Sequence, residues 1–481
     1  MNYSEYDGLA LADLVRNRKI SPDELLEEAV SRAEKAQARV NCFAALYPDL
    51  AREQIAKGGM EGPYAGVPFV TKDLAVGVKG APLTGGSRAY KDTVATDDTT
   101  LTQRYRAAGL VFFGSTTTPE FGLTLTTEST LYGRTRNPWD RTRIAGGSSG
   151  GAAAAVASGV LPVAHASDGG GSIRIPAACC GVFGLKPSRG RTPMGPSRTE
   201  GWNGLSTVHV VSRTVRDSAA LLDLTHGPET GSRYIATPPV RPYLSELDRD
   251  PRPLRIALWR TAPNGTKPDA DAAAGLDATA KLLERLGHVV VEAGPILNGE
   301  ALGKAALFTI SANIAAQLDE HGEARGRPVG EDEIELITAG MVRLGRTVPM
   351  VELAKANNAF ITAAIQYEHF LDAGGFDMTL SPTLHRAPDL LGTMALTADP
   401  QKMGEAIAGF APHCAVFNQM GAPAMSVPLH WTAPTPTAPG GLPIGMMFGA
   451  RFGQEGLLLN LAAQLERAAP WAHRKPPEWV G

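Results

Sequence analysis

Two glycine-rich turns that each present serine limit the folds open to this chain more than any other feature: GGSSGG at 146–151 and DGGGS at 168–172. Between them, residues 150–158 are rich in alanine and favour a helix, and residues 160–166 are typical of a strand. A helix that leaves at about 1.5 Å per residue and a strand that returns at about 3.3 Å per residue can bring the second turn back to the first. We therefore expect the serines of both turns to share one site.

The rest of the chain alternates between short apolar runs and helical patterns. Apolar runs at 67–70, 109–114, 254–259 and 289–291 alternate with helical stretches around 99–108 and 270–286. Such alternation is typical of an α/β domain with a largely buried sheet.

A helix start signal stands near the N-terminus. Ser21 is suited to the N-cap, Pro22 to the first helical position, and Glu24 completes a capping box. We predict a helix that begins at Pro22.

No internal repeat or break in composition divides the 481 residues. We predict one domain, residues 1–481, with a catalytic core at about 60–240 and 376–470. Residues of about 300–371 are predominantly helical and are either a cap over a pocket or part of the core. A Pro/Thr-rich loop at 432–441 separates two apolar runs and is typical of a hairpin-like excursion.

Composition narrows the classes of partner. Lys plus Arg number 46 against 49 Asp plus Glu, a net charge of −3, which argues against a binder of nucleic acid or of an anionic membrane. No apolar run reaches the roughly 18 to 20 residues that span a bilayer, and charged residues interrupt the N-terminal stretch, unlike a signal peptide. We expect a cytoplasmic protein with a small, near-neutral substrate. The sequence is compatible with a homodimer.

The four cysteines, Cys42, Cys179, Cys180 and Cys414, are too few for a disulfide scaffold and lack the CxxC spacing of a zinc site. We expect reduced structural thiols, no metal and no cofactor.

The second glycine-rich turn has the chemistry of an oxyanion hole. Glycine allows close backbone approach, so the N–H groups of Gly169, Gly170, Gly171 and Ser172 can converge on one point. Such donors would stabilise a tetrahedral intermediate formed at Ser172 Oγ. A flexible Gly/Ser turn or an anion-binding loop has the same composition, so the turn alone leaves these alternatives open.

A nucleophilic serine needs a base. The nearest histidine, His165, falls inside the predicted strand 160–166, which indicates a core or supporting position. Lys72 follows the apolar run 67–70 and could be the base if burial keeps its amine neutral; a solvated surface lysine is the alternative.

The first turn also satisfies G-x-S-x-G, the nucleophile-elbow motif. The stretch before it is polar, however, and a nucleophile elbow follows a hydrophobic strand.

Together these residues resemble the amidase signature family. The resemblance rests on GGSSGG at 146–151, the D-x-GG-S-I-R-x-P pattern at 168–176 and CGVFGLKPSRGR at 180–191. GVPFVTKD around Lys72 and FNQMGAPAMSVP near the C-terminus also fit. The similarity covers most of the chain outside about 238–377.

The resemblance implies an α/β fold with a central mixed β-sheet flanked by helices on both faces and a helical cap-like region. It implies that Ser172 is the nucleophile, that Ser148 bridges after a cis peptide bond from Gly147, and that Lys72 is the base. Lys72 would take the Ser172 proton through Ser148, and water would hydrolyse the acyl-enzyme. We call residues 168–172 the nucleophile turn.

Other residues have supporting roles in this scheme. Asp168 and Arg174 flank the nucleophile turn with opposite charges and could lock it by a charge-assisted hydrogen bond. We place Ser149 in the same network. The resemblance puts Gly122 near the acyl pocket, with Leu123 beside it, where a glycine would widen that pocket.

The function implied is hydrolysis of the carbon–nitrogen bond of a small linear, cyclic or aryl amide. Within the family, PVAHASDGGGSIRIPA at 162–177, RPYL at 241–244 and GRPVGEDEIE at 326–335 are similar to bacterial amidases of the 6-aminohexanoate cyclic dimer hydrolase type. A carbamate or ester hydrolase of the same fold, a catalytically inactive binder and the glutaminase subunit of a tRNA-dependent amidotransferase are the alternatives. The last typically has a stretch resembling FASSLDQ where this chain, after Arg191, reads TPMGPSRTEGWNGLS.

Overall fold

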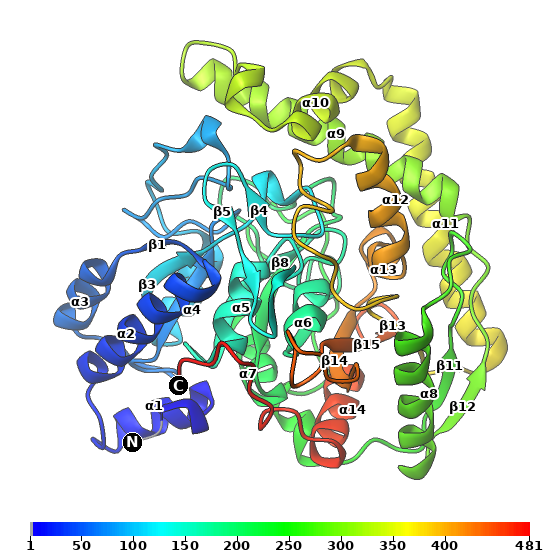
Figure 1. The fold of residues 1–481 in the computed structure, drawn as a ribbon, viewed down its shortest axis with the longest axis horizontal. Helices are drawn as coiled ribbons and strands as arrows, with labels where there is room; N and C mark the ends of the chain where they lie inside the picture. Colours follow the sequence, from blue (N-terminus) through cyan, green and yellow to red (C-terminus); the bar gives the residue numbers. More distant parts are fainter. Residues whose placement is uncertain (1–2) are drawn as a thin grey trace.

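A computed structural model describes residues 3–481, and within them a mixed eight-stranded sheet forms the centre of the molecule (Figure 1). In spatial order its strands are β12 (Val289–Glu292), β11 (Arg255–Leu258), β13 (Met378–Pro382), β15 (Pro443–Ala450), β14 (Ala424–Trp431), β9 (Phe183–Lys186), β10 (Thr207–Ser212) and β8 (Val163–Asp168). β11 pairs in parallel with β12 and β13, and the other neighbours pair antiparallel. The predicted mixed α/β sheet is confirmed.

A second, three-stranded sheet packs beside β8. It consists of β1 (Phe43–Leu46), β3 (Val111–Thr116) and β2 (Pro68–Lys72), with β2 parallel to β3. Two short ribbons join it to the first glycine-rich turn: β4 (Glu128–Ser129) with β5 (Gly133–Arg134), and β6 (Arg136–Asn137) with β7 (Asp140–Ile144). The backbone N–H of Lys72 donates to Nδ1 of His165 in β8 at 3.1 Å, which ties the end of β2 to the edge of the large sheet.

Helices cover both faces of the large sheet. α6 (Arg174–Cys180) lies on one face, because a Cβ on Gly445 of β15 would meet Ala178 Cβ at 2.7 Å. α8 (Ala270–Arg285) lies on the other, because a Cβ on its Gly275 would meet Cε of Met446, the next residue of β15, at 2.7 Å. Successive residues of a strand point to opposite faces, so these contacts place the two helices on opposite sides.

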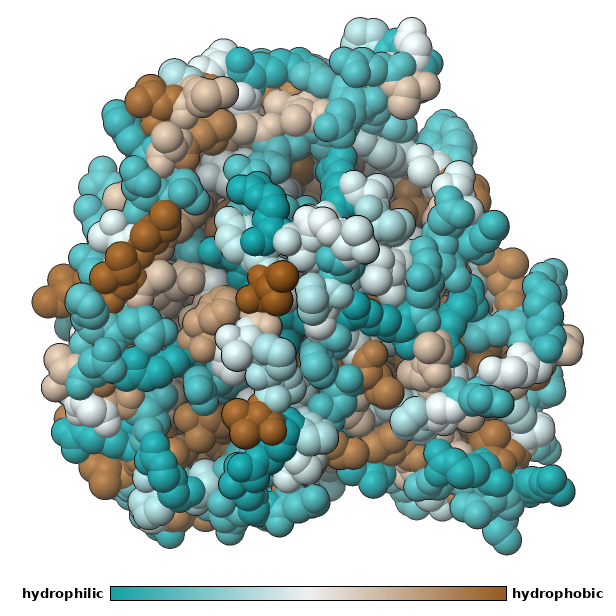
Figure 2. Space-filling model, turned by 180° about the vertical axis from the view of Figure 1, so that it is seen from behind, coloured by the Kyte–Doolittle hydropathy of each residue, from teal (hydrophilic) through white to brown (hydrophobic). Residues whose placement is uncertain are grey.

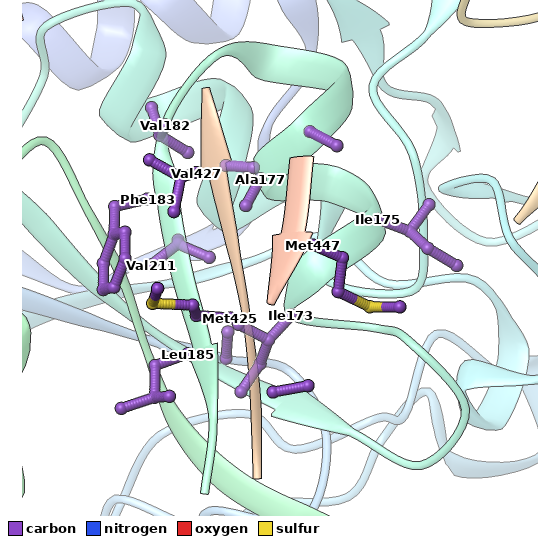
Figure 3. Packing of buried hydrophobic residues seen from close by; sticks show 14 of the residues in the cluster. Ile173, Ile175, Ala177, Val182, Phe183, Leu185, Val211, Met425, Val427 and Met447 are labelled. Atoms are coloured by element: carbon purple, nitrogen blue, oxygen red, sulfur yellow. The ribbon is translucent and has the colours of Figure 1, made fainter. Parts of the chain in front are cut away.

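The core under α6 is apolar and fully buried. Ile173 and Ala177 pack there with Leu185 of β9, Met425 of β14 and Met447 of β15 (Figure 3). The other helices around the sheet are α5 (Gly150–Ala157), α7 (Val215–Thr225), α13 (Cys414–Met420) and α14 (Glu455–Ala468). The core therefore forms the floor on which the nucleophile turn rests.

The helical region is both cap and core. It comprises α9 (Gly299–Ala324), α10 (Leu336–Thr347) and α11 (Met350–Gly374), with α12 (Pro400–Phe410) following in the chain. Asn313 and Gln317 of α9 line the cavity that contains Ser172. Phe360 and Tyr367 of α11 belong to the main hydrophobic core. Both interpretations of this region are thus partly right, for different helices.

β8 lies later in the chain at both ends than the predicted strand 160–166. The N–H of Val160 closes the end of α5 by donating to Ala155 O at 3.1 Å, and Pro162 has no N–H for a ladder. Pairing with β10 continues to Asp168, opposite Thr207. The nucleophile turn therefore starts directly from the strand end.

The four cysteines are buried and free, in the core positions that the sequence indicated.

None of the helices within residues 3–481 combines the length and apolar character needed to cross a membrane. The face shown in Figure 2 is mainly hydrophilic, with hydrophobic residues in small separate groups.

The first four helices, α1 (Gly8–Arg16), α2 (Pro22–Val40), α3 (Pro48–Lys57) and α4 (Thr100–Ala107), pack around the smaller sheet (Figure 1). α2 begins at Pro22 as predicted. Ser21 Oγ accepts the N–H of Glu24 at 3.2 Å, and Glu24 Oε2 accepts the N–H of Ser21 at 2.8 Å. The capping box is therefore complete.

Replacing Ser21 by alanine should lower the free energy of unfolding by about 1 kcal/mol, because the N–H of Glu24 loses its acceptor. Urea denaturation followed by circular dichroism measures this loss. Ser21→Thr keeps a hydroxyl and should remain close to wild type. Equal stability of the alanine variant and wild type would contradict a stabilising cap.

Candidate active site

Lys72, the last residue of β2, extends its amine to the first glycine-rich turn and to the end of β8. Its Nζ lies 2.7 Å from Ser148 Oγ and 2.9 Å from Ser167 Oγ, and the residue is 0% exposed. Burial lowers the pKa of Lys72 to about 7, against an opposing effect of the negative charge on Asp168. The amine can therefore be neutral near neutral pH, as a general base must be.

His165 supports the backbone of Lys72. Its Nδ1 accepts the N–H of Lys72, and its ring lies edge-on to Tyr105 with centroids 6.4 Å apart. Burial, together with the positive charge of Lys72, lowers the pKa of His165 to about 3. The imidazole has the supporting position in a strand that the sequence indicated, and its low pKa makes it a poor base.

The two glycine-rich turns meet, as the sequence predicts. The N–H of Ser149 donates to Ser172 O at 3.3 Å, Ser149 Oγ donates to Ser167 O at 3.1 Å, and the N–H of Ser167 donates to Ser149 Oγ at 3.3 Å. The peptide bond between Gly147 and Ser148 is cis, as the resemblance implied. Ser149 thus ties the turn that carries Ser148 to the nucleophile turn.

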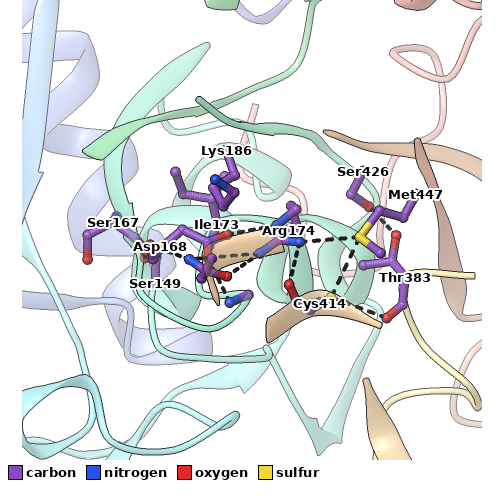
Figure 4. Close-up of polar contacts among 12 residues, drawn as sticks. Ser149, Ser167, Asp168, Ile173, Arg174, Lys186, Thr383, Cys414, Ser426 and Met447 are labelled. Atoms are coloured by element: carbon purple, nitrogen blue, oxygen red, sulfur yellow. Dashed lines mark hydrogen bonds and ion pairs between the residues drawn. The ribbon is translucent and has the colours of Figure 1, made fainter. Parts of the chain in front are cut away.

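Asp168 and Arg174 form a fully buried ion pair at the base of the nucleophile turn (Figure 4). Arg174 Nε and Nη2 donate to the two carboxylate oxygens, each at 3.0 Å. Asp168 also accepts the N–H of Gly171 at 2.7 Å and of Ile173 at 3.1 Å. Burial alone would raise the pKa of Asp168, but the charge and hydrogen bonds of Arg174 hold it well below its usual range. The turn is therefore built around an ionised carboxylate.

α13 completes this network from a distant part of the sequence. Asn418, 250 residues beyond Asp168, donates Nδ2 to Asp168 O at 2.8 Å and to Oδ1 at 2.9 Å. Its Oδ1 accepts Arg174 Nη2 at 2.7 Å, and the carbonyl of Cys414 accepts Arg174 Nη1 at 2.8 Å. Both polar groups of the Asn418 amide are used to hold the ion pair.

The expected oxyanion hole needs one correction. The N–H of Gly171 is already bound to Asp168 Oδ1, so Gly171 leaves the set of free donors. Within residues 3–481, no acceptor binds the N–H of Gly169, Gly170 or Ser172. The nucleophile turn thus offers three donors, fewer than the sequence predicts, because its carboxylate folds back over one of them.

Ser148, Ser167 and Ser172 open onto one cavity of about 590 Å³. Its apolar lining includes Leu74, Tyr90, Phe121, Met194 and Trp202, and its charged or amide side chains are those of Arg198, Glu200, Asn203, Asn313, Gln317 and Glu320. A cavity of this volume, lined by both apolar and polar side chains, can hold a small molecule.

Gly122 lies beside Ser148, as expected. A Cβ built on it would stand 2.9 Å from Ser148 Oγ, so a side chain there would enter the space in front of the serine. Leu123 does not line the cavity. The left-handed φ angles of Phe121 and Gly122, 50° and 74°, turn the chain, and Leu123 packs against the apolar cluster of Ala89 and the helical region. The expectation for Leu123 is corrected accordingly.

The solvent-exposed rim of the cavity joins α9 to the segment after Pro196. Arg198 Nη2 and Glu320 Oε2 form an ion pair at 2.7 Å, with side chains 57% and 66% exposed. Asn313 Nδ2 donates to Asn203 Oδ1 at 3.4 Å. Exposed pairs of this kind contribute little to stability, so the rim is held more weakly than the floor.

Sequence reasoning gave no role to three residues of this site. Ser167 and Asn418 lie inside motifs that resemble the family. The sequence therefore marked both positions, but it did not show what each side chain contacts. Trp202, in the segment GWNG, carried no such signal. Its position depends on a turn conformation that the sequence does not show.

Comparison with known proteins gives the family. A sequence model of the Amidase family matches residues 24–459. This chain belongs to the Amidase family. It is accordingly a hydrolase of amide carbon–nitrogen bonds. The resemblance inferred from the motifs is confirmed.

Similar proteins cover almost the full length of the chain. The 6-aminohexanoate-cyclic-dimer hydrolase of Pseudomonas sp. (strain NK87) is 37% identical over 486 residues, 98% of this chain and 96% of that protein. A solved structure of 6-aminohexanoate cyclic dimer hydrolase complexed with substrate has a TM-score of 0.92 at 35% identity and covers 99% of this chain and 100% of its own. A bacterial aryl acylamidase of the amidase signature family has a TM-score of 0.85 at 27% identity and covers 97% of both chains.

Replacing Arg174 by methionine should lower the free energy of unfolding by about 3–5 kcal/mol, because it leaves the Asp168 carboxylate buried without its counter-charge. Chemical denaturation measures the loss. Arg198→Met is the matched control: its ion pair is exposed and should contribute less than about 1 kcal/mol. Similar losses in the two variants would contradict the role given to the buried pair.

Proposed function

We propose that this enzyme hydrolyses a small amide through an acyl-enzyme on Ser172, with Ser148 as the bridging hydroxyl and Lys72 as the general base. The observation that carries the proposal is the 2.7 Å contact between Lys72 Nζ and Ser148 Oγ at the wall of the cavity onto which Ser172 opens. A buried amine with a pKa of about 7 can accept a proton at neutral pH.

In the first step, Ser172 Oγ attacks the amide carbonyl carbon. Its proton passes to Ser148 Oγ while the Ser148 proton passes to Lys72 Nζ, so the oxygen–carbon bond forms as the amine becomes an ammonium. The free N–H groups of Gly169, Gly170 and Ser172 would stabilise the charge that develops on the carbonyl oxygen.

In the second step, the tetrahedral intermediate collapses and the carbon–nitrogen bond breaks. The departing nitrogen takes back the proton from Lys72 through Ser148, and the amine leaves. Water then attacks the ester carbonyl carbon and gives a proton to the same relay. The bond between this carbon and Ser172 Oγ breaks, the Ser172 oxygen takes the proton back from Lys72 through Ser148, and the acid leaves. No proton is lost or gained over the cycle.

The substrate class follows from the cavity and from the similar proteins. Apolar side chains lie next to both serine turns: a Cβ on Gly122 would meet Ser148 Oγ and Leu74 Cδ2, and a Cβ on Gly169 would meet the ring of Trp202. The charged side chains of Arg198 and Glu320 are exposed at the rim. We therefore propose an amide whose acyl group is uncharged next to the carbonyl, in a linear, cyclic or aryl compound. Esters and carbamates with a better leaving group would use the same acyl chemistry.

Ser172→Ala should abolish turnover of every amide that wild type cleaves, because no other group in this scheme forms the acyl bond. A screen of aliphatic, cyclic and aryl amides, run with wild type and variant in parallel, measures this and narrows the substrate class. Circular dichroism of the variant shows whether the fold is kept. Substantial turnover by a folded Ser172→Ala protein would remove Ser172 from its proposed role.

The pH profile should follow the protonation of Lys72. Protonation of its amine below a pKa of about 7 removes the base, so kcat/KM should fall on acidification, to about a hundredth of its plateau at pH 5. It should be level above pH 8. A profile that is flat down to pH 5 in folded enzyme would contradict Lys72 as the base.

Control variants test two buried carboxyl groups as other sources of this acidic limb. Lys186, Glu335 and Glu466 also have pKa values shifted to about 7, in each case mainly by burial. The limb should persist in Glu335→Gln and in Glu466→Gln, because neither carboxyl contacts the serines. Loss of the limb in either variant would assign it to that carboxyl instead of Lys72.

A further inference from the structure

The ring of Trp202 lies directly against the nucleophile turn. A Cβ built on Gly169 would stand 2.6 Å from Trp202 Cζ3 and 2.8 Å from Cε3, well inside contact distance. The φ of Gly169 is outside the left-handed region, so its backbone would accept a larger residue. The indole, helped by Ser206 Oγ at 3.0 Å, is what excludes a side chain at this position.

The turn that carries Trp202 has an unusual backbone. Trp202, Asn203 and Gly204 have φ angles of 50°, 52° and 82°. The left-handed conformation is unfavourable for residues other than glycine, and it persists only where the surroundings enforce it. Here the N–H of Gly204 donates to Gly201 O at 3.1 Å and the N–H of Leu205 to Trp202 O at 3.2 Å. These two hydrogen bonds hold the backbone from which the indole projects.

The same side chain anchors the Trp202 turn and the nucleophile turn. Asn418 Nδ2, which donates to Asp168, also lies within hydrogen-bond distance of Leu205 O at 3.1 Å. Arg189 donates Nε to Gly204 O at 2.6 Å and Nη2 to Asn418 O at 3.0 Å. The position of the indole relative to Ser172 is therefore fixed by the network that fixes the nucleophile.

We propose that Trp202 is a specificity-determining residue that limits branching at the acyl carbon next to the scissile carbonyl. The inference rests on the proposed function: if the N–H groups of Gly169 and Gly170 hold the carbonyl oxygen, a ring against Gly169 lies beside the carbonyl carbon. The acyl group stays on Ser172 through both steps, so its shape must fit throughout. An unbranched acyl chain fits beside the indole. A second substituent on the carbon next to the carbonyl would collide with the ring.

Two isomeric esters test this directly. 4-Nitrophenyl butyrate and 4-nitrophenyl isobutyrate share a leaving group and differ only in branching next to the carbonyl. In Trp202→Ala, the ratio of kcat/KM for isobutyrate to that for butyrate should rise at least about tenfold over wild type, since one misplaced methyl group is worth about tenfold or more. Trp202→Phe should give an intermediate ratio. Comparing this ratio between each variant and wild type cancels the difference in intrinsic reactivity between the two esters.

Trp431→Ala is the matched control. Trp431 is half-buried like Trp202 but lies in β14 and does not line the cavity. Its variant loses the same side chain and should keep the wild-type ratio. A ratio that stays within twofold of wild type in Trp202→Ala, or that rises equally in Trp431→Ala, would overturn the proposal.

A second set of variants does not depend on Trp202→Ala alone. Gly169→Ala should lower kcat/KM for both esters at least about tenfold, because its methyl group displaces the indole or the turn, and Trp202→Phe or Trp202→Ala in the same chain should restore much of the loss. Gly170→Ala, whose Cβ would meet nothing closer than Ala415 Cβ at 4.0 Å, should not be rescued in this way. Strictly additive effects of the changes at 169 and 202 would contradict the contact.

Failure of the proposed function gives a different result. Ser172→Ala should lose both ester reactions whatever residue stands at 202. Ester turnover that persists in Ser172→Ala contradicts the nucleophile, whereas an unchanged branching ratio in active Trp202 variants contradicts only the specificity role.

Discussion

The site depends on a lysine amine that is buried among hydroxyl groups, while the nearby carboxylate is committed to another cation. Charging Lys72 would place an ammonium ion where water cannot solvate it, so burial lowers its pKa to about 7. Asp168 would oppose this shift by its charge, but Arg174 binds both of its oxygens. The buried ion pair thus has two effects: it shapes the nucleophile turn, and it limits the counter-charge that acts on Lys72.

The architecture explains how the proposed base, bridge and nucleophile, which come from separate segments, reach one point. β2 delivers Lys72, the turn before α5 delivers Ser148, and the end of β8 delivers Ser172. The bond from the Lys72 backbone to His165 joins the small sheet to the large one at this junction. The apolar core under α6 then supports the nucleophile turn from below (Figure 3). Lys72 ends a strand, and Ser148 and Ser172 lie in turns that adjoin α5 and β8.

Much of the fold and the meeting of the two serine turns could be predicted from local signals. The capping box at Ser21, the alternation of strands and helices, and the two serine turns depend on residues close together in the chain. The free donors of the nucleophile turn could not be counted in this way, because the carboxylate of Asp168 folds back onto Gly171. Leu123 was misplaced because the left-handed Phe121 and Gly122 turn the chain there.

The sequence by itself determined the candidate groups of the site: two serines and a lysine in motifs whose glycines permit close approach, inside an ordinary α/β pattern. Tertiary structure decided the rest. Only packing shows that Lys72 is buried rather than solvated, that Asn418 closes the ion pair from 250 residues away, and that the indole of Trp202 lies against Gly169. The physical reason is that burial, pKa and steric exclusion depend on neighbours in space, whereas a linear pattern records neighbours along the chain.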